Sequence, residues 1–253
     1  SILKVLQRRH TARQAIEAFQ NCRAAGFQNI SIDLMYSLPG ETLSTWQQDL
    51  DQALLLHPEH LSAYHLIYEE DTVLWKLREQ HKVEEADEDL SVSLFSTLID
   101  RLTSEGYDHY EISNFSLPGL YSRHNSSYWT EKKYLGCGPS AHSYNGVSRQ
   151  WNVASLDTYI KGISAGTPVF EIEELDLYTR YNDFVITRIR TEWGMPLSKL
   201  RDEFGEKLYD YCLRMAAPHL KQGTLELVND ILKLTRKGIF ISDGIMSDML
   251  WTD

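Results

Sequence analysis

Cysteine is scarce in this chain, which has only three among its 253 residues. Cys22, Cys137 and Cys212 are too widely spaced for a disulfide framework, and an odd number without a secretion signal is typical of a reducing compartment. No basic start followed by an apolar segment marks a leader sequence. The sequence therefore predicts a cytoplasmic protein.

Long apolar runs and positive charge are also in short supply. No run approaches the roughly 18 to 20 apolar residues that cross a bilayer, so we expect no membrane span. Lys and Arg number 25 against 36 Asp and Glu, and the resulting net charge of −11 repels phosphate backbones. We therefore expect no nucleic-acid partner, because no local basic face offsets this average.

The first part of the chain alternates between helix and strand patterns. Thr11 is the predicted N-cap of a helix with apolar residues at helical spacing. Apolar segments at 30–36 and 61–68 read as strands that begin roughly 30 residues apart, the spacing of a strand-helix-strand crossover. Thr42 is the predicted N-cap of the helix between them. This pattern predicts an α/β fold with parallel strands.

The same pattern continues through a charged, mobile stretch at 69–89, a further helix, and a strand at 107–112. These units are too few for an eight-unit barrel, which takes about 250 residues. The first residue is Ser1 rather than Met. We therefore expect the chain to begin inside its fold, with the second half of a TIM-like barrel at residues 1–150.

The last part of the chain has a different pattern. After a predicted linker at 151–170, mixed-charge helices lead to an alternating segment at 224–233 that reads as a β-hairpin, and a final helix follows. Helices followed by a short β wing suggest a small winged-helix-like module. We assign this helical domain to residues 171–253.

Two charged residues are candidates for a binding site in the barrel. Asp33 lies in the carboxyl half of a predicted strand, where barrel enzymes keep their active sites, although a structural aspartate bonded to a neighbouring loop is an open alternative. Arg8, on spacing alone, fits a surface cation better than a ligand clamp.

Residues 106–144 are rich in histidine, tyrosine and tryptophan, which can bind metal or stack on a porphyrin. His124, Cys137 and His142 have no zinc-site spacing, and each histidine alone is better explained by an ordinary hydrogen bond. The small residues at 136–141 allow a ligand or another backbone to approach closely, and a tight turn between a strand and a loop is an open alternative. No cation in the sequence activates Cys137 as a nucleophile.

Four motifs, at 33–42, 110–115, 122–129 and 138–144, taken together resemble the oxygen-independent coproporphyrinogen III oxidase-like (HemN-like) group of radical S-adenosylmethionine (SAM) proteins. The His-Asn-x-x-Tyr-Trp motif resembles that of its haem-binding HemW branch. The resemblance implies SAM contacts at Arg8, Asp33, Ile67 and His142. It implies haem contacts at His124, Asn125, Tyr128 and Trp129.

The family also holds a [4Fe-4S] cluster with a Cys-x-x-x-Cys-x-x-Cys loop, and this sequence has no such spacing. Cluster thiolates must converge on one site, so the three separate cysteines cannot replace the loop. We expect the cluster cysteines to lie upstream of Ser1. By itself, the chain is predicted to bind no cluster, to hold no cofactor tightly and to catalyse no radical chemistry.

The resemblance implies that the intact protein is a cytosolic haem chaperone that binds a cluster, SAM and haem and delivers haem to an acceptor protein. The alternative is an oxygen-independent coproporphyrinogen III oxidase, an oxidoreductase of porphyrin biosynthesis. A nucleic-acid-binding module, suggested by the winged-helix-like tail, is disfavoured by the acidic charge.

Overall fold

The computed structural model describes residues 2–252 and divides into two compact units, one ending at Ser122 and the other beginning at Arg123. The boundary lies earlier than residue 150, and the predicted linker at 151–170 contains a helix. The predicted extents of the barrel part, 1–150, and of the helical domain, 171–253, stay predictions. Within residues 2–252, none of the helices is long and apolar enough to cross a membrane.

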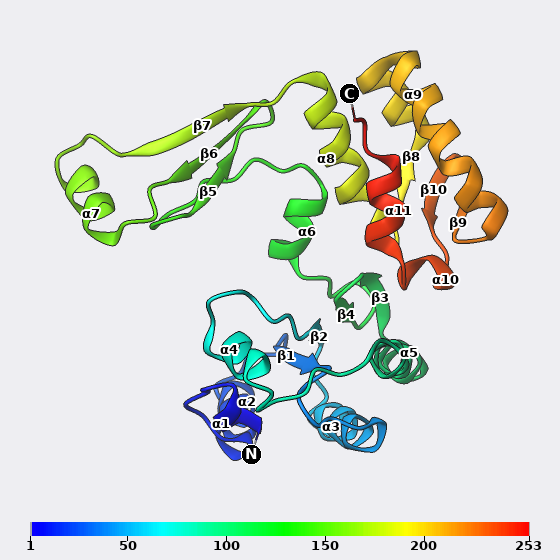
Figure 1. Cartoon of the computed structure of the whole chain (residues 1–253). Helices are drawn as coiled ribbons and strands as arrows, with labels where there is room; N and C mark the ends of the chain where they lie inside the picture. The colour runs from blue at the N-terminus through cyan, green and yellow to red at the C-terminus, as the bar shows by residue number, and fades with distance from the viewer. Residues whose placement is uncertain (1, 253) are drawn as a thin grey trace. The chain divides into compact units, whose positions relative to one another are not determined.

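The first unit is a four-stranded sheet with helices (Figure 1). Its helices are α1 (Ile2–Val5), α2 (Ala12–Ala24), α3 (Leu43–Leu55), α4 (Val73–Glu79) and α5 (Glu88–Ser104). Its strands are β1 (Ser31–Tyr36), β2 (His60–His65), β3 (Asp108–Glu111) and β4 (Asn114–Ser116). The strand order is β1-β2-β4-β3, with β1 and β2 parallel and β4 antiparallel to both of its neighbours.

Local sequence explains where the first helices begin. Thr11 and Thr42 each cap a helix, and in both the capping box is complete because the side chain of the third helical residue bonds back to the cap. These two predicted caps are confirmed, as is the parallel pairing of the strands on either side of α3. The predicted mobile stretch at 69–89 is wrong in part, since Thr72 caps α4 there.

One face of this sheet forms the core with α3 and α5. The ring of Tyr36 on β1 lies 5.7 Å from that of Trp46 on α3 and 5.9 Å from that of Phe95 on α5, centroid to centroid. Leu61 and Phe115 are fully buried on the same side of β2 and β4. Apolar residues alternate with polar ones along the strands, which leaves the opposite face polar.

The second unit contains two small antiparallel sheets and a group of helices (Figure 1). One sheet, β5-β6-β7, consists of β5 (His142–Tyr144), β6 (Ser148–Asn152) and β7 (Phe170–Glu174). The other, β8-β10-β9, consists of β8 (Met195–Pro196), β9 (Leu225–Val228) and β10 (Ile231–Leu234). The helices are α6 (Arg123–Trp129), α7 (Leu156–Ser164), α8 (Leu177–Ile189), α9 (Leu197–Gln222), α10 (Arg236–Ile239) and α11 (Ser242–Met249).

Helices α8, α9 and α11 and the β8-β10-β9 sheet make a helical domain with a β wing. Tyr181, Phe184 and Leu200 are fully buried in it, and the Tyr181 hydroxyl donates to the Met249 carbonyl oxygen at 3.0 Å. Gly205, whose φ of 79° suits glycine, kinks α9. The predicted hairpin is confirmed as β9 and β10.

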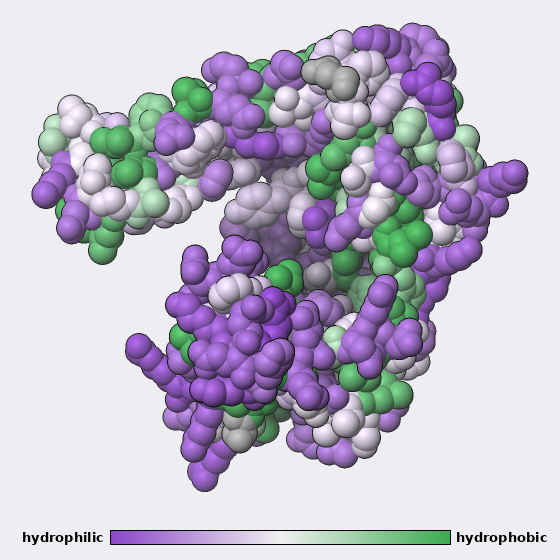
Figure 2. Space-filling view, viewed as in Figure 1, coloured by the Kyte–Doolittle hydropathy of each residue, from purple (hydrophilic) through white to green (hydrophobic). Residues whose placement is uncertain are grey.

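Helix α7 has an exposed apolar side. Leu156 is 59% exposed, Ile160 is 52% exposed and Ile163 is 51% exposed. Figure 2 shows apolar residues as green patches among the polar residues of this part of the chain. Nothing in the sequence pattern predicted this helix, because it lies within the segment taken to be a linker.

Candidate functional site

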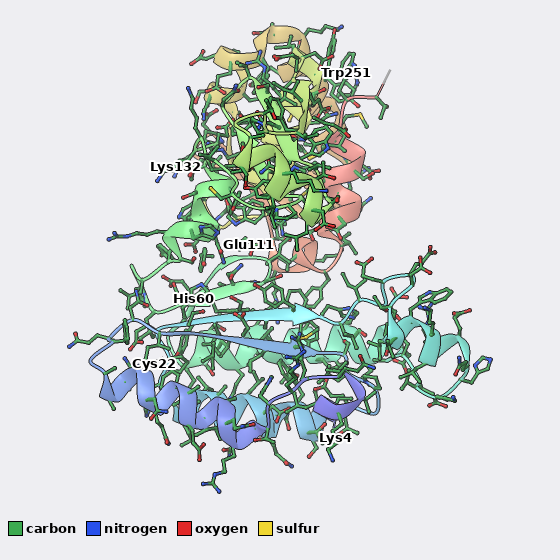
Figure 3. All side chains as sticks on the ribbon, turned by 90° about the vertical axis from the view of Figure 1, so that its left-hand side faces the viewer. Lys4, Cys22, His60, Glu111, Lys132 and Trp251 are labelled. Atoms are coloured by element: carbon green, nitrogen blue, oxygen red, sulfur yellow. The ribbon has the colours of Figure 1, made fainter. Side chains whose placement is uncertain are left out.

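The polar face of the first unit's sheet holds the strand residues that point away from the apolar core. In the parallel register, Ser31 lies opposite His60 and Asp33 lies opposite Ser62. Figure 3 shows His60 and Glu111 on one side of the strands and Cys22, on α2, on the other. The exposed carboxylate of Asp33 therefore lies on a polar surface rather than in the core.

A chain of hydrogen bonds crosses three strands on this face. The Ser31 hydroxyl and His60 Nδ1 are 2.8 Å apart, and His60 Nε2 and the Tyr110 hydroxyl are 2.7 Å apart. Burial lowers the pKa of His60, although the charge of Asp33 acts in the opposite direction. Burial also raises the pKa of Tyr110 to about 12. Both groups are thus neutral donors and acceptors near neutral pH.

A second set of buried polar groups lies beside the first. The Ser62 hydroxyl donates to Asn114 Oδ1 at 3.0 Å, and Asn114 Nδ2 donates to the Glu111 carboxylate. The backbone N–H of Ser113 donates to the same carboxylate. These bonds satisfy buried polar atoms that would otherwise destabilise the fold by about 1–3 kcal/mol each. The face is therefore fixed in one arrangement.

A cavity of about 320 Å³ adjoins the carboxyl end of β1. Arg8 lines it together with Met35 and Leu66, and the remaining lining residues are Val5, Leu6, Gln7, Thr72, Val73 and Leu74. Asp33 is two residues before Met35 on the same face of β1. The structure therefore brings Arg8 close to the end of the strand that carries Asp33.

The four residues implied as SAM contacts do not all line this cavity. Arg8 lines it, whereas Ile67 follows the lining residue Leu66 and has its side chain 68% exposed. His142 belongs to the second unit and lines a different cavity of about 500 Å³. An exposed guanidinium and an exposed carboxylate fit the carboxylate and amino groups of an amino-acid-like ligand.

His142 and the small-residue segment before it are explained by packing. The His142 ring is stacked on that of Trp151, with 5.8 Å between centroids. A Cβ at Gly136 would lie 2.1 Å from the His142 carbonyl oxygen, so only glycine fits there. Close approach of another backbone, one of the possibilities for residues 136–141, accounts for Gly136.

Helix α6 carries the His-Asn-x-x-Tyr-Trp motif. His124 and Tyr128 are four residues apart on one exposed side, with their rings edge to face and 5.3 Å between centroids. The Tyr128 hydroxyl is 3.4 Å from His124 Nε2. Trp129 is turned to another side, where the Arg190 guanidinium lies 4.1 Å from its ring centroid. Asn125 is half-buried.

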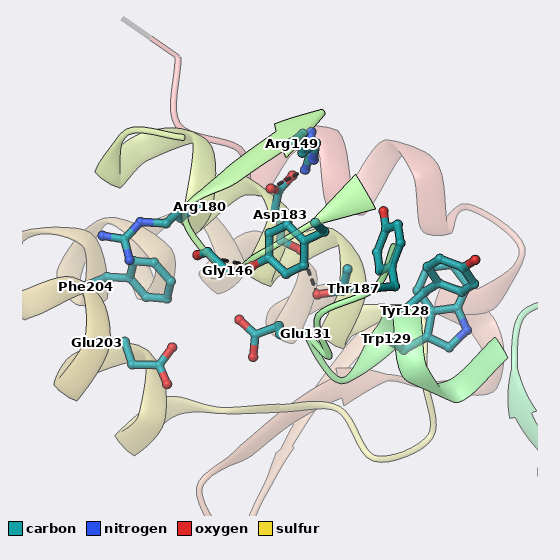
Figure 4. A pocket seen from close by; sticks show the side chains of 12 residues that line it. Tyr128, Trp129, Glu131, Gly146, Arg149, Arg180, Asp183, Thr187, Glu203 and Phe204 are labelled. Carbon is teal, nitrogen blue, oxygen red and sulfur yellow. Dashed lines mark hydrogen bonds and ion pairs between the residues drawn. The ribbon is translucent and has the colours of Figure 1, made fainter. Parts of the chain in front are cut away.

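Tyr128 and Trp129 line a cavity of about 470 Å³ in the second unit (Figure 4). Two more tyrosines continue the aromatic wall. The Tyr134 ring centroid is 5.0 Å from that of Tyr128 and 6.1 Å from that of Tyr144. The other lining residues are Glu131, Gly146, Arg149, Arg180, Asp183, Thr187, Glu203 and Phe204. The motif thus belongs to a concave site with both aromatic and charged groups.

Ion pairs hold the carboxylates of this cavity. Glu131 accepts from Arg188 at 2.8 Å and from Lys199 at 2.7 Å. Its burial acts to raise the pKa, but the two cations outweigh burial and lower the pKa of Glu131 below its ordinary value. The backbone φ of 57° at Glu131 is unfavourable for a side chain that is not glycine. The two ion pairs therefore hold a strained residue two positions after the end of the motif.

Asp183 on α8 pairs with Arg149 on β6, as the dashed line in Figure 4 marks. Burial raises the pKa of Asp183, and the hydrogen bond from Arg149 opposes this shift. Glu131, Arg149 and Asp183 were not predicted from the sequence, because they come from separate parts of the chain. One local pattern in the sequence could have indicated the cavity: Arg180 and Asp183 are three residues apart, which places both on one side of a helix.

No group of three histidine, cysteine, aspartate or glutamate side chains within residues 2–252 could hold a metal ion. Cys22 and Cys137 are exposed, and Cys212 is buried. Burial raises the pKa of the Cys212 thiol to about 11, which disfavours the thiolate that binds iron. The cysteines of this chain therefore do not fit a [4Fe-4S] cluster.

Comparison with known proteins finds a matching family model and several similar proteins. Residues 175–241 match the family model described as HemN C-terminal domain. The heme chaperone HemW of Mycobacterium tuberculosis is 31% identical over 98% of this chain, and that of Lactococcus lactis is 30% identical over 100% of it. The chain is therefore similar to these HemW proteins over almost all of its length. It spans 62% and 66% of the lengths of these two relatives.

A solved member of the HemN-like family has the same fold. The coproporphyrinogen III oxidase HemN of Escherichia coli, titled a radical SAM enzyme, matches with a TM-score of 0.79 and 18% identity over 98% of this chain and 61% of that one. The predicted fold class is confirmed: part of a radical SAM α/β barrel is followed by a small helical, winged-helix-like domain. Residue roles are not transferred by a likeness of this kind.

Proposed function

We propose that the intact protein is a cytoplasmic haem chaperone that binds haem, SAM and a [4Fe-4S] cluster and delivers haem to an acceptor protein. The observation that carries the proposal is the pair His124 and Tyr128, exposed on one side of α6 next to an aromatic cavity. An exposed imidazole can ligate haem iron, and neighbouring aromatic rings can contact the macrocycle. The names of the HemW relatives support the same reading.

Under this proposal Arg8, Asp33 and Ile67 of the first unit contact SAM, and a SAM contact at His142 stays a prediction from the resemblance. The guanidinium of Arg8 would bind the ligand's carboxylate, and the exposed carboxylate of Asp33 would accept from its polar groups. When bound next to a reduced cluster, SAM supplies one-electron chemistry. We assign no cluster ligand to this chain, because its cysteines do not fit one.

Replacing His124 by alanine should shift the Soret band and weaken haem binding by about ten-fold, because the exposed imidazole is the proposed iron ligand. Haem titration followed by absorbance measures both effects. His10→Ala removes an exposed histidine from the first unit and is the matched control. An unchanged spectrum and affinity in His124→Ala would rule out this ligand.

The alternative function is oxygen-independent coproporphyrinogen III oxidation, and the fold of HemN favours it. In that case the intact, cluster-containing protein would decarboxylate propionates of the porphyrinogen. Turnover of coproporphyrinogen III separates the two functions. Product formation would replace the chaperone proposal by the oxidase.

A further inference from the structure

Ion pairs engage most of the charged groups around the 470 Å³ cavity of the second unit. Glu131 is paired with Arg188, and Asp183 is paired with Arg149. Lys199 contacts both Glu131 and Glu203, at 2.7 Å and 3.4 Å. Each lining carboxylate therefore has a cation of its own.

Arg180 is left over from this pairing. It lines the cavity from α8, is half-buried, and forms no ion pair within residues 2–252. The guanidinium stays charged and offers several donors in one plane, which match the two oxygens of a carboxylate. Arg149 and Arg180 are the two cations among the lining residues, and Arg149 is paired with Asp183. The guanidinium of Arg180 is therefore open to an anionic ligand.

The wall next to these charges is aromatic, with rings inclined to one another by 68° between Tyr128 and Tyr134 and by 37° between Tyr134 and Tyr144. Tyr128, Tyr134 and Tyr144 follow one another with ring centroids 5.0 Å and 6.1 Å apart. Burial raises the pKa values of Tyr134 and Tyr144, so both phenols stay protonated and can donate a hydrogen bond. Rings and phenolic donors together suit a planar ligand with a polar edge.

We infer that this cavity binds the carboxylate-bearing edge of a planar aromatic ligand, with Arg180 as the partner of the carboxylate and the three tyrosines as its contact surface. The identity of the ligand rests on the proposed function, in which the carboxylate is a propionate of a tetrapyrrole. The iron ligand His124 and the carboxylate partner Arg180 are then separate parts of one site.

The test uses the complete chain and a metal-free ligand, coproporphyrin III, compared with its tetramethyl ester. Binding is followed by porphyrin fluorescence. Wild type should bind the free acid more tightly than the ester. Arg180→Gln should weaken binding of the acid by about ten-fold, the size of one charge-assisted hydrogen bond, and leave the ester unchanged. Arg180→Lys, which keeps the charge, should restore part of the loss.

Arg214→Gln is the matched control, because it removes an exposed cation of the same unit that does not line the cavity. Equal discrimination between acid and ester in wild type and Arg180→Gln would overturn the inference, as would failure of wild type to bind the acid. If haem gives no Soret response but Arg180-dependent binding of the metal-free acid persists, the chaperone proposal fails and the carboxylate site stands.

Discussion

Trp46→Ala should lower the free energy of unfolding of the first unit by about 3–5 kcal/mol, as expected for a large aromatic side chain removed from a core. Trp46 is 1% exposed and packs against Tyr36. Its indole N–H also donates to the Leu94 carbonyl oxygen at 3.0 Å, which links α3 to α5. Urea denaturation followed by circular dichroism measures the change.

Two further variants show where this effect comes from. Trp46→Phe keeps most of the ring but loses the bond to Leu94, and should destabilise by about 1–3 kcal/mol. Leu55 is the last residue of the same helix and is 69% exposed. Leu55→Ala should therefore change the free energy of unfolding by less than about 0.5 kcal/mol. If Trp46→Ala were as mild as Leu55→Ala, α3 would not be part of the core.

Glu131→Gln should lower the stability of the second unit by about 1–3 kcal/mol. It leaves Arg188 and Lys199 without their shared carboxylate, and removing one partner of a buried pair is costly. The side chains of Glu131 and Lys199 are 28% and 36% exposed. Solvent screening therefore reduces the loss of stability to about half of that expected for a fully buried pair. Thermal unfolding at neutral pH measures this difference.

The same substitution should change how stability depends on pH. The pKa of Glu131 is lowered in the folded state from its ordinary value of 4.5, so its contribution is fully present above that value. It is lost as pH falls through the lowered value. Wild type should therefore lose more stability than Glu131→Gln on acidification below about pH 5. Parallel stability profiles for the two proteins would contradict this prediction.

Local signals in the sequence predicted the helices and the parallel strands well. Thr11 and Thr42 cap helices because a hydroxyl at that position satisfies a free backbone N–H, whatever the rest of the fold. Gly205 interrupts α9 because its φ of 79° suits glycine. The spacing of β1 and β2 follows from the length of one crossover helix.

Elements without such signals were missed. Strand β5 has three residues and β7 has none that are buried, so neither shows the alternation that marks a strand. The predicted strand at 107–112 is β3, which continues as a hairpin into β4 after an irregularity in register. Pairing partners distant in sequence decide these elements.

The candidate site was predictable only in its motifs. The sequence singled out Tyr128 and Trp129, but not that Tyr134, Tyr144 and Arg149 lie near them, because tertiary packing assembles the cavity from α6, β6 and α8. The roles of Arg8, Asp33, Ile67 and His142 in SAM binding stay predictions.

The alternation along β1 and β2 also separates two kinds of evolutionary constraint. Residues such as Leu61 face the helices, and a substitution there lowers the stability of the fold. Asp33 faces the opposite side and is exposed, so a change there leaves the core intact and alters what that surface can bind. Related proteins can therefore diverge in ligand while keeping the same strands, by substitution at the exposed positions of this face.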